Sequence, residues 1–435
     1  MRVPRARHML LALVIAAAVV VAAAAPSFGA AHRRSAPIEI TFVDRVTSPT
    51  HDKFVKYLVD TFNQRNDGKI HVSYSGIPVN SYVAKIPLVL KSNKSPDVFF
   101  SYEAGFAKYI IDSGWAAPLD KYWTKYGWTK ELTPAASDVA TIDGHKYFLP
   151  YYMAASVLWY NTDLFKKNGL TPPKTYKEMT ADAAKLKASG VAPYMLANQQ
   201  QWEAQFPFSA YFANRYGLST YRGLINRKIP WTDPRVVDAL NAMAQDVKDG
   251  QYLQPINGMD FDTTAIIFWK KEQAAMWYQG SFILGKFLDK GKLAYPVDWV
   301  PYPQIGSTKP SVSVYAESTY MLNKNSKNKD AAAAFLAFVV SKEAQTKMLE
   351  LDGPFAANRS VRPPASSPPL VRKLAALIAS YDKPTFTHPD HALSPDVAVP
   401  FLRELQSVLA GRQSAAKAAA ITEAAAKRAQ GPVKG

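Results

Sequence analysis

Residues 147–160 read Tyr147-Phe-Leu-Pro-Tyr-Tyr-Met-Ala-Ala-Ser-Val-Leu-Trp-Tyr160. This stretch is apolar over its whole length, rich in aromatic residues, and contains no helix-capping residue. Such a run is typical of an extended segment rather than of an amphipathic helix. We therefore expect a long strand here that crosses from one lobe of the protein to a second.

Upstream of this stretch, strand-like and helix-like patterns of apolar residues alternate along the chain. Strand, helix, strand, helix, strand, helix in this order predicts a parallel sheet covered by helices on both faces. Ligands bind beyond the carboxyl ends of the strands in such sheets, so we expect ligand-facing loops at 44–48, 76–81 and 101–105. The expected strands are 37–43, 69–74 and 98–100, and the expected helices are one from Pro49 to Asn66-Asp67-Gly68, one at 81–91, and one through Phe106 and Ile110 to Gly114.

The chain downstream is rich in helical patterns. One helix should begin at Thr232-Asp233-Pro234, where an N-cap precedes proline, and end at Gly250. The Ala-rich stretch from Pro400 onward predicts a solvated terminal helix.

The N-terminus has the three parts of an export signal: Arg2, Arg5 and Arg7, then an apolar run over 9–25, then small residues that suit cleavage. We expect residues 1–30 to be a signal peptide and the protein to be exported, extracellular or periplasmic. The alternative is a retained membrane anchor, because the apolar run is close to spanning length.

The net charge and the cysteine content of the chain bear on which classes of function are possible. Lys and Arg number 52 against 35 Asp and Glu, which gives a net charge of +17. These basic residues are scattered and form no nucleic-acid motif, so no nucleic-acid partner is expected. The chain has no cysteine. This excludes disulfides, thiolate catalysis and cysteine-bound metals, as well as the lipidated cysteine that tethers many exported bacterial proteins.

Catalytic and metal-binding motifs are absent from the sequence, and no cofactor or metal is expected. His388 and His391 have a metal-like spacing, but Pro389 lies between them, and a surface loop is the simpler prediction. Because a glycosidase needs only two carboxylates, a secreted carbohydrate hydrolase stays open as an alternative. The adjacent Tyr151 and Tyr152 leave a ferric-ion site open, although one should face the core and the other a cleft.

Several segments, in a fixed order, resemble one known family. They are 82–86, 95–99, 114–120, 147–152, 159–165, 274–281, 326–337 and 352–358. This ordered set resembles the extracellular solute-binding proteins of ATP-driven sugar importers, the family of maltose-binding protein. The missing lipid-attachment cysteine departs from many members and leaves the mode of tethering open.

This resemblance implies an α/β fold of two lobes joined by several chain crossings, with a ligand cleft between the lobes that closes by hinge bending. Lobe one would comprise 37–150 with 302–330, and lobe two 151–301 with 331–435. The implied protein is a monomer and not an enzyme. It would capture a carbohydrate and deliver it to the permease subunits of an ABC transporter. Binding of a peptide, a polyamine or ferric ion is the alternative within the same fold.

Sugar recognition needs aromatic platforms and a few fixed polar groups. Trp202 lies in a polar loop, Asn198-Gln-Gln-Gln-Trp-Glu203, which is an unusual place for a core residue. We expect it to be the main stacking platform, the alternative being a loop anchor. Trp277 alternates with apolar neighbours and is expected in the core. The other predicted ligand-binding residues are Asp44 and Arg45 after the first strand, Tyr102 and Glu103 after the third, Tyr152, Gly280 and Ser281 for close backbone approach, Phe282, and Tyr315 and Glu317 on a returning strand.

Overall fold

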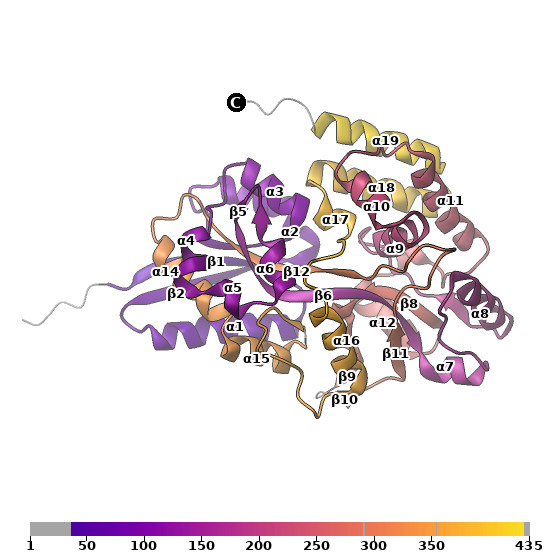
Figure 1. Ribbon diagram of the computed structural model, residues 1–435, viewed down its shortest axis with the longest axis horizontal. Helices are drawn as coiled ribbons and strands as arrows, with labels where there is room; N and C mark the ends of the chain where they lie inside the picture. Colours follow the sequence, from indigo (N-terminus) through magenta and orange to yellow (C-terminus); the bar gives the residue numbers. More distant parts are fainter. Residues whose placement is uncertain (1–35, 290–291, 354, 430–435) are drawn as a thin grey trace, which may run out of the picture. The chain divides into compact units, whose positions relative to one another are not determined.

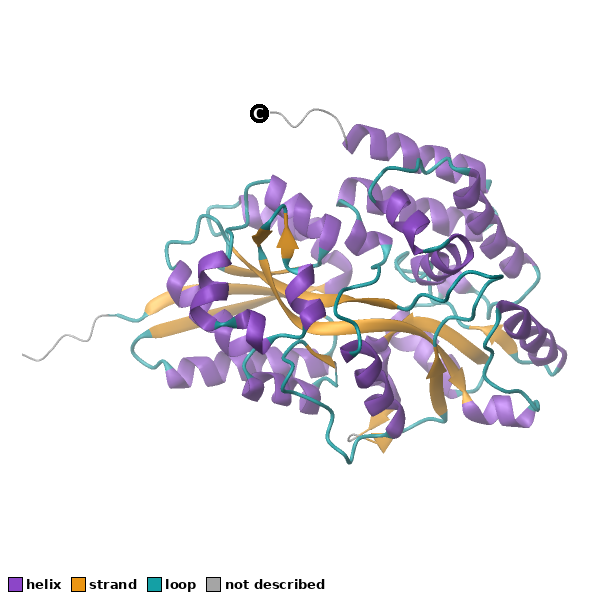
Figure 2. Cartoon of the chain, viewed as in Figure 1, coloured by secondary structure: helices purple, strands orange, loops and turns teal. Residues whose placement is uncertain are grey.

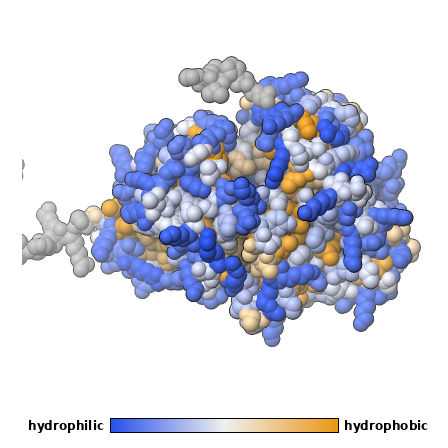
Figure 3. Space-filling model, viewed as in Figure 1, coloured by the Kyte–Doolittle hydropathy of each residue, from blue (hydrophilic) through white to orange (hydrophobic). Residues whose placement is uncertain are grey.

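The computed structural model describes residues 36–289, 292–353 and 355–429, and the chain from Pro37 onward forms one compact unit (Figure 1). The predicted signal peptide at 1–30 lies outside the described residues. Within the described ranges, no helix combines the length and the apolar character needed to cross a membrane. The surface in Figure 3 is mostly hydrophilic, as expected for a protein with this many charged residues.

One mixed sheet forms the centre of this unit, with the strand order β2-β1-β3-β12-β6-β8-β7. Its first three strands, β1 (Ile38–Val46), β2 (Ile70–Pro78) and β3 (Val98–Ser101), are parallel to one another, as predicted. Beyond them β12 (Ser313–Leu322) runs antiparallel to β3, so the sheet as a whole is mixed. The N-terminal sheet is therefore continued by a strand that begins at Ser313, whereas β3 ends at Ser101.

Strand β6 (Phe148–Asn161) confirms the extended segment predicted at 147–160. It pairs antiparallel with β12 through its first half and with β8 (Ala274–Gly280) through its second half, and every residue of it is buried. Figures 1 and 2 show this strand running through the sheet with helices above and below it. The remaining strands are β4 (Thr141–Ile142), β5 (His145–Lys146), β7 (Ala192–Tyr194), β9 (Leu288–Asp289), β10 (Lys292–Leu293), β11 (Val297–Val300) and β13 (Phe355–Ala356).

The helices between the first strands begin and end close to where the sequence predicts. Helix α1 (Pro49–Arg65) starts at Ser48, whose hydroxyl accepts the backbone N–H of His51. Helix α2 (Val79–Lys91) contains Pro87, and α3 (Ala104–Asp112) ends just before Gly114, which has a positive φ. Helices α14 (Lys329–Val339) and α15 (Lys342–Leu351) pack against α1. Helix α1 is expected in lobe one, whereas residues 331–435 are expected in lobe two. The lobe boundaries themselves stay a prediction.

A helical layer covers the other end of the sheet. Helix α11 (Pro234–Lys248) begins at the predicted cap Asp233, whose carboxylate accepts a backbone N–H. The terminal helix α19 (Ala415–Ala429) buries an alanine face against α18 (Pro395–Leu409), so it is less solvated than predicted. The other helices are α4 (Asp120–Tyr126), α5 (Trp128–Glu131), α6 (Pro134–Val139), α7 (Thr162–Lys167), α8 (Tyr176–Ala188), α9 (Gln205–Tyr216), α10 (Leu218–Ile225), α12 (Ile266–Lys270), α13 (Leu284–Phe287), α16 (Pro369–Ala379) and α17 (Pro389–Ala392), with single turns η1 (Ile256–Gly258), η2 (Phe261–Ala265) and η3 (Ser281–Ile283).

Candidate ligand-binding cleft

A cavity of about 480 Å³ opens at the carboxyl ends of β1 and β3. Its walls come from distant parts of the chain: the start of α1, strands β6 and β12, the loop before α9, the turns η2 and η3, the loop after α15, and α17 with α18. A volume of this size is typical of sites for small organic molecules. The predicted location at the ends of the parallel strands is therefore where the structure has its cleft.

Aromatic rings form one wall of the cavity. The indole of Trp202 is half-buried there and meets the rings of Phe261 and Phe282 edge to face, with centroids 5.0 and 6.1 Å apart. Phe206 completes the wall at 5.8 Å from Trp202. These contacts fix the orientation of the indole and leave part of it facing the cavity. Trp277, by contrast, lies in the core, as predicted.

Gly280 leaves space for a ring of this aromatic wall and does not contact the cavity itself. A Cβ atom added at Gly280 would lie 2.3 Å from the ring of Phe282 and 2.8 Å from the hydroxyl of Tyr315. The missing side chain therefore makes room for Phe282, and Gly280 itself does not line the cavity. Its neighbour Ser281 does, and the Ser281 hydroxyl accepts the backbone N–H of Ala155 at 3.2 Å.

A buried ion pair forms another part of the cavity wall. The Arg45 guanidinium donates to the Glu317 carboxylate at 2.8 Å, to the Ser318 hydroxyl at 2.7 Å and to the Tyr102 hydroxyl at 3.0 Å. Burial raises the pKa of Glu317, and the charge of Arg45 opposes that rise. Arg45 and Asp44 belong to β1 itself and do not follow it, because the strand extends to Val46. Their predicted loop position is therefore wrong, although Arg45 reaches the cavity.

His51 is a cavity residue that the sequence did not reveal. Its imidazole lies between two carboxylates, 3.2 Å from Asp44 and 3.3 Å from Asp352. Burial alone would lower the pKa of His51, but the hydrogen bonds to Asp352 and Asp44 outweigh it and raise the pKa to about 9. The side chain therefore carries a proton at neutral pH. Asp44 lies behind it, fully buried, and also accepts the hydroxyl of Tyr320 at 2.7 Å.

The segment around α17 is buried, so the predicted surface loop at His388 and His391 is wrong. His391 stacks on the ring of Tyr102 with centroids 4.0 Å apart, and His388 lies 2.8 Å from the hydroxyl of Ser156 on β6. Gly105 makes this packing possible, because a Cβ there would lie 2.2 Å from a carbonyl oxygen of α17. The C-terminal chain thus passes between α3 and β6 at the base of the cleft.

Four polar atoms on cavity-lining residues are buried and have no hydrogen-bond partner among the described residues. They are the Nε atom of Arg45, the hydroxyl of Tyr152, one carboxylate oxygen of Asp390 and the Nδ1 atom of His391. Burial raises the pKa of Asp390 to about 7, and the side chain of the nearby Gln205 opposes that rise. Because an unpaired buried polar group is costly, such atoms are ready to bond a ligand hydroxyl or water.

The cavity brings together most of the predicted site residues and leaves out a few. Glu103 is buried beneath it and accepts the backbone N–H of Ala316 at 2.8 Å, and burial raises its pKa to about 8. Tyr315 is also fully buried, among core residues. The predicted residues that line the cavity are Arg45, Tyr102, Tyr152, Trp202, Ser281, Phe282 and Glu317, and those that do not are Asp44, Glu103, Gly280 and Tyr315.

Sequence comparison identifies the protein family. The model of the family described as bacterial extracellular solute-binding protein matches residues 47–346. The chain belongs to the bacterial extracellular solute-binding proteins. Like other solute-binding proteins, it has a two-lobed α/β fold. In the described part of this solute-binding protein, no group of three or more His, Asp or Glu side chains could hold a metal ion.

Individual relatives cover different shares of this solute-binding protein. An uncharacterized ABC transporter extracellular-binding protein of Pyrococcus horikoshii is 29% identical over 61% of the chain, and the match spans only 59% of that relative. The sn-glycerol-3-phosphate-binding periplasmic protein of Rhizobium meliloti is 23% identical over 75% of the chain and 77% of its own length. The solved structure of a chitin oligosaccharide binding protein aligns with a TM-score of 0.82 at 21% identity, and covers 90% of this chain and 99% of that one.

Proposed function

We propose that this protein captures a sugar or an oligosaccharide in the cleft and delivers it to the permease subunits of an ABC transporter. One observation carries the proposal: an aromatic wall around Trp202 and buried, unpartnered polar atoms on Tyr152, Asp390 and His391 line the same cavity. A sugar ring presents C–H faces for stacking and hydroxyls for hydrogen bonding at its rim, so the two walls match its two kinds of surface.

The charges in the cavity favour a neutral ligand over a phosphate ester. Each cationic side chain already has a carboxylate partner: Arg45 pairs with Glu317, His51 with Asp352, and Lys286 with Asp262 at 2.9 Å. Asp390, whose pKa is raised to about 7 by burial, adds part of a negative charge at neutral pH. A phosphate would have to displace one of these carboxylates and remain close to the others, and like charges at short distance are unfavourable. We therefore expect a neutral carbohydrate to bind, and sn-glycerol 3-phosphate to bind poorly.

Capture requires no chemical step. We propose that the lobes close around the sugar and that the ligand favours the closed form only through its additional contacts there. The protein would act as an exported monomer, extracellular or periplasmic, after removal of residues 1–30, and would not be attached through a cysteine-linked lipid. Recovery of the unaltered sugar after incubation supports binding without catalysis, whereas release of smaller sugars would identify a hydrolase.

Thermal unfolding with a ligand panel tests the proposal. The panel comprises neutral mono- and oligosaccharides, sn-glycerol 3-phosphate, peptides, polyamines and ferric ion. A ligand at one hundred times its Kd stabilises the folded protein by about 2.7 kcal/mol, which raises the melting temperature by several degrees. A shift with a neutral carbohydrate is the expected result. A shift only with the phosphate ester, a peptide, a polyamine or iron would contradict the proposed ligand class.

The variant Trp202→Ala identifies the site. We expect at least a tenfold loss of sugar affinity, equivalent to about 1.4 kcal/mol. The matched control is Trp115→Ala, because Trp115 is also half-buried but lies outside the cavity lining. Equal affinity in the two variants, both folded, would remove Trp202 from the site.

A further inference from the structure

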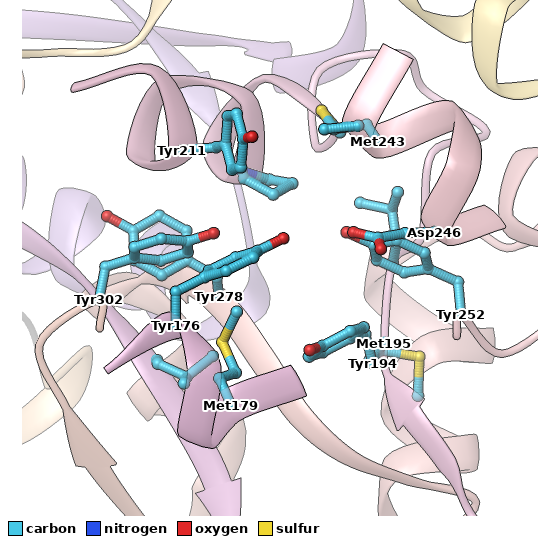
Figure 4. A pocket seen from close by; sticks show the side chains of 14 residues that line it. Tyr176, Met179, Tyr194, Met195, Tyr211, Met243, Asp246, Tyr252, Tyr278 and Tyr302 are labelled. Carbon is cyan, nitrogen blue, oxygen red and sulfur yellow. The ribbon is translucent and has the colours of Figure 1, made fainter. Parts of the chain in front are cut away.

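A second cavity lies apart from the cleft and shares no lining residue with it. It has a volume of about 40 Å³ and is lined by 14 residues, six of which are tyrosines. Figure 4 shows their rings around a central space, with the carboxylate of Asp246 on one side of it. The tyrosines come from separate elements, namely Tyr176 on α8, Tyr194 on β7, Tyr211 on α9, Tyr252 after α11, Tyr278 on β8 and Tyr302 after β11.

The rings contact one another in pairs. Tyr176 and Tyr211 have centroids 5.7 Å apart, and Tyr278 and Tyr302 lie 5.1 Å apart, both pairs edge to face. Of the six hydroxyls, only that of Tyr278 donates a hydrogen bond to a protein group in the described ranges, to the carbonyl of Ser156 at 3.3 Å. Among the residues that the structure describes, no Lys, Arg or His side chain lines the cavity. Its walls therefore consist largely of electron-rich faces of aromatic rings and of tyrosine hydroxyls.

Asp246 gives this cavity a negative charge. Its side chain makes no ion pair and accepts no hydrogen bond within the part of the chain that the structure describes. Burial, reinforced by the nearby Asp249, raises the pKa of Asp246 to about 6, so the carboxylate is mostly ionised at neutral pH. The neighbouring Lys187 is already used, since its ammonium donates to the backbone carbonyl of Asp249. The cavity therefore holds a carboxylate without a bound cation.

Chemistry of this kind selects cations. Aromatic faces attract an ammonium group within about 6 Å of the ring centroid, and desolvation strengthens the attraction. No lysine, arginine or histidine of the described chain lines this cavity to bind a phosphate, and its side-chain donors are the tyrosine hydroxyls. The volume accommodates about three groups of the size of a water molecule. We propose that this tyrosine cavity is a second binding site, specific for a small alkylammonium ion whose charge is neutralised by Asp246.

Methionine methyl groups provide a direct readout in the whole protein. Met179, Met195 and Met243 line the cavity, while Met321 is buried in the sheet far along the chain. With 13C-methyl-labelled methionine, dimethylammonium chloride should shift the three cavity signals in a saturable way at constant ionic strength and leave Met321 unchanged. Propan-2-ol, which is similar in size and uncharged, should bind at least tenfold more weakly. Equal binding of the alcohol, or no saturable shift with dimethylammonium, would overturn the proposal.

Two variants test whether the carboxylate of Asp246 binds the ammonium ion. Asp246→Asn should weaken dimethylammonium binding at least tenfold, whereas Asp249→Asn, one helical turn away on the exposed surface, should not. Trp202→Ala in the cleft should also leave it unchanged. Loss of binding in Trp202→Ala with retention in Asp246→Asn would place the ion in the cleft and overturn the proposal. The comparison with propan-2-ol needs no variant, so it decides the matter even if Asp246→Asn does not fold.

Discussion

Raising the pH from 7 to 10 should destabilise this protein through one side chain, His51. The imidazole is 4% exposed and bridges Asp44 and Asp352 as a cation. Its pKa is about 9 in the folded protein, against an ordinary value of 6.5. Because the folded state holds this proton more tightly than the unfolded state, its contribution is complete below pH 6.5 and is lost as the pH rises through 9. The difference corresponds to about 3 kcal/mol of unfolding free energy.

Urea unfolding at pH 6, 7.5, 9 and 10 measures this effect. As far as His51 is concerned, the wild-type unfolding free energy should fall by about 1 kcal/mol between pH 6 and 7.5 and by about a further 2 kcal/mol between pH 7.5 and 10. Lysines and tyrosines also titrate at high pH, so the comparison is made with His51→Gln, which has no titrating ring. The variant should be less stable at pH 6 and have a flatter profile. Parallel profiles in the two proteins would refute the reasoning.

Three substitutions test other contacts of the cleft. Gly105→Ala should lower the unfolding free energy in urea by about 1–3 kcal/mol, because its Cβ would collide with the backbone of α17; unchanged stability would contradict that packing. Gly280→Ala should displace the ring of Phe282 and weaken sugar binding in calorimetry at least tenfold, and wild-type affinity would show that the ring position is unimportant. Glu317→Leu should leave Arg45 charged and buried without its carboxylate, so that the unfolding free energy falls by about 3–5 kcal/mol; a loss below 1 kcal/mol would mean that the ion pair is not needed for stability.

Local signals in the sequence predicted the first half of the fold well. Ser48-Pro49 marked the start of α1, and the apolar run at 147–160 marked β6, because capping and burial are properties of neighbouring residues. The direction and position of β12 could not be predicted in this way. Its ten residues are all buried and show no alternation, and nothing in them specifies a place between β3 and β6.

The site was predictable only where a residue stood out from its own neighbours. Trp202 in a polar loop and Tyr152 in an apolar strand are such residues, and both line the cavity. His51 gave no signal, because its role depends on Asp352, which lies 301 residues away along the chain. His391 stood out only through its spacing from His388, and its stacking on Tyr102 depends on a residue of the distant N-terminal chain. The site residues that were missed have partners far away along the chain, and the sequence near each residue does not identify such partners.

The position of β12 in the sheet determines when the sheet can be completed during translation. This strand, residues 313–322, separates β3 from β6 and pairs with both. A ribosome that has translated the first 300 residues has therefore made both halves of the sheet but not the strand that joins them. The N-terminal β–α units must wait, with an open edge at β3, until almost three quarters of the protein exists. Such late closure between distant segments slows folding and keeps the nascent chain open for that time.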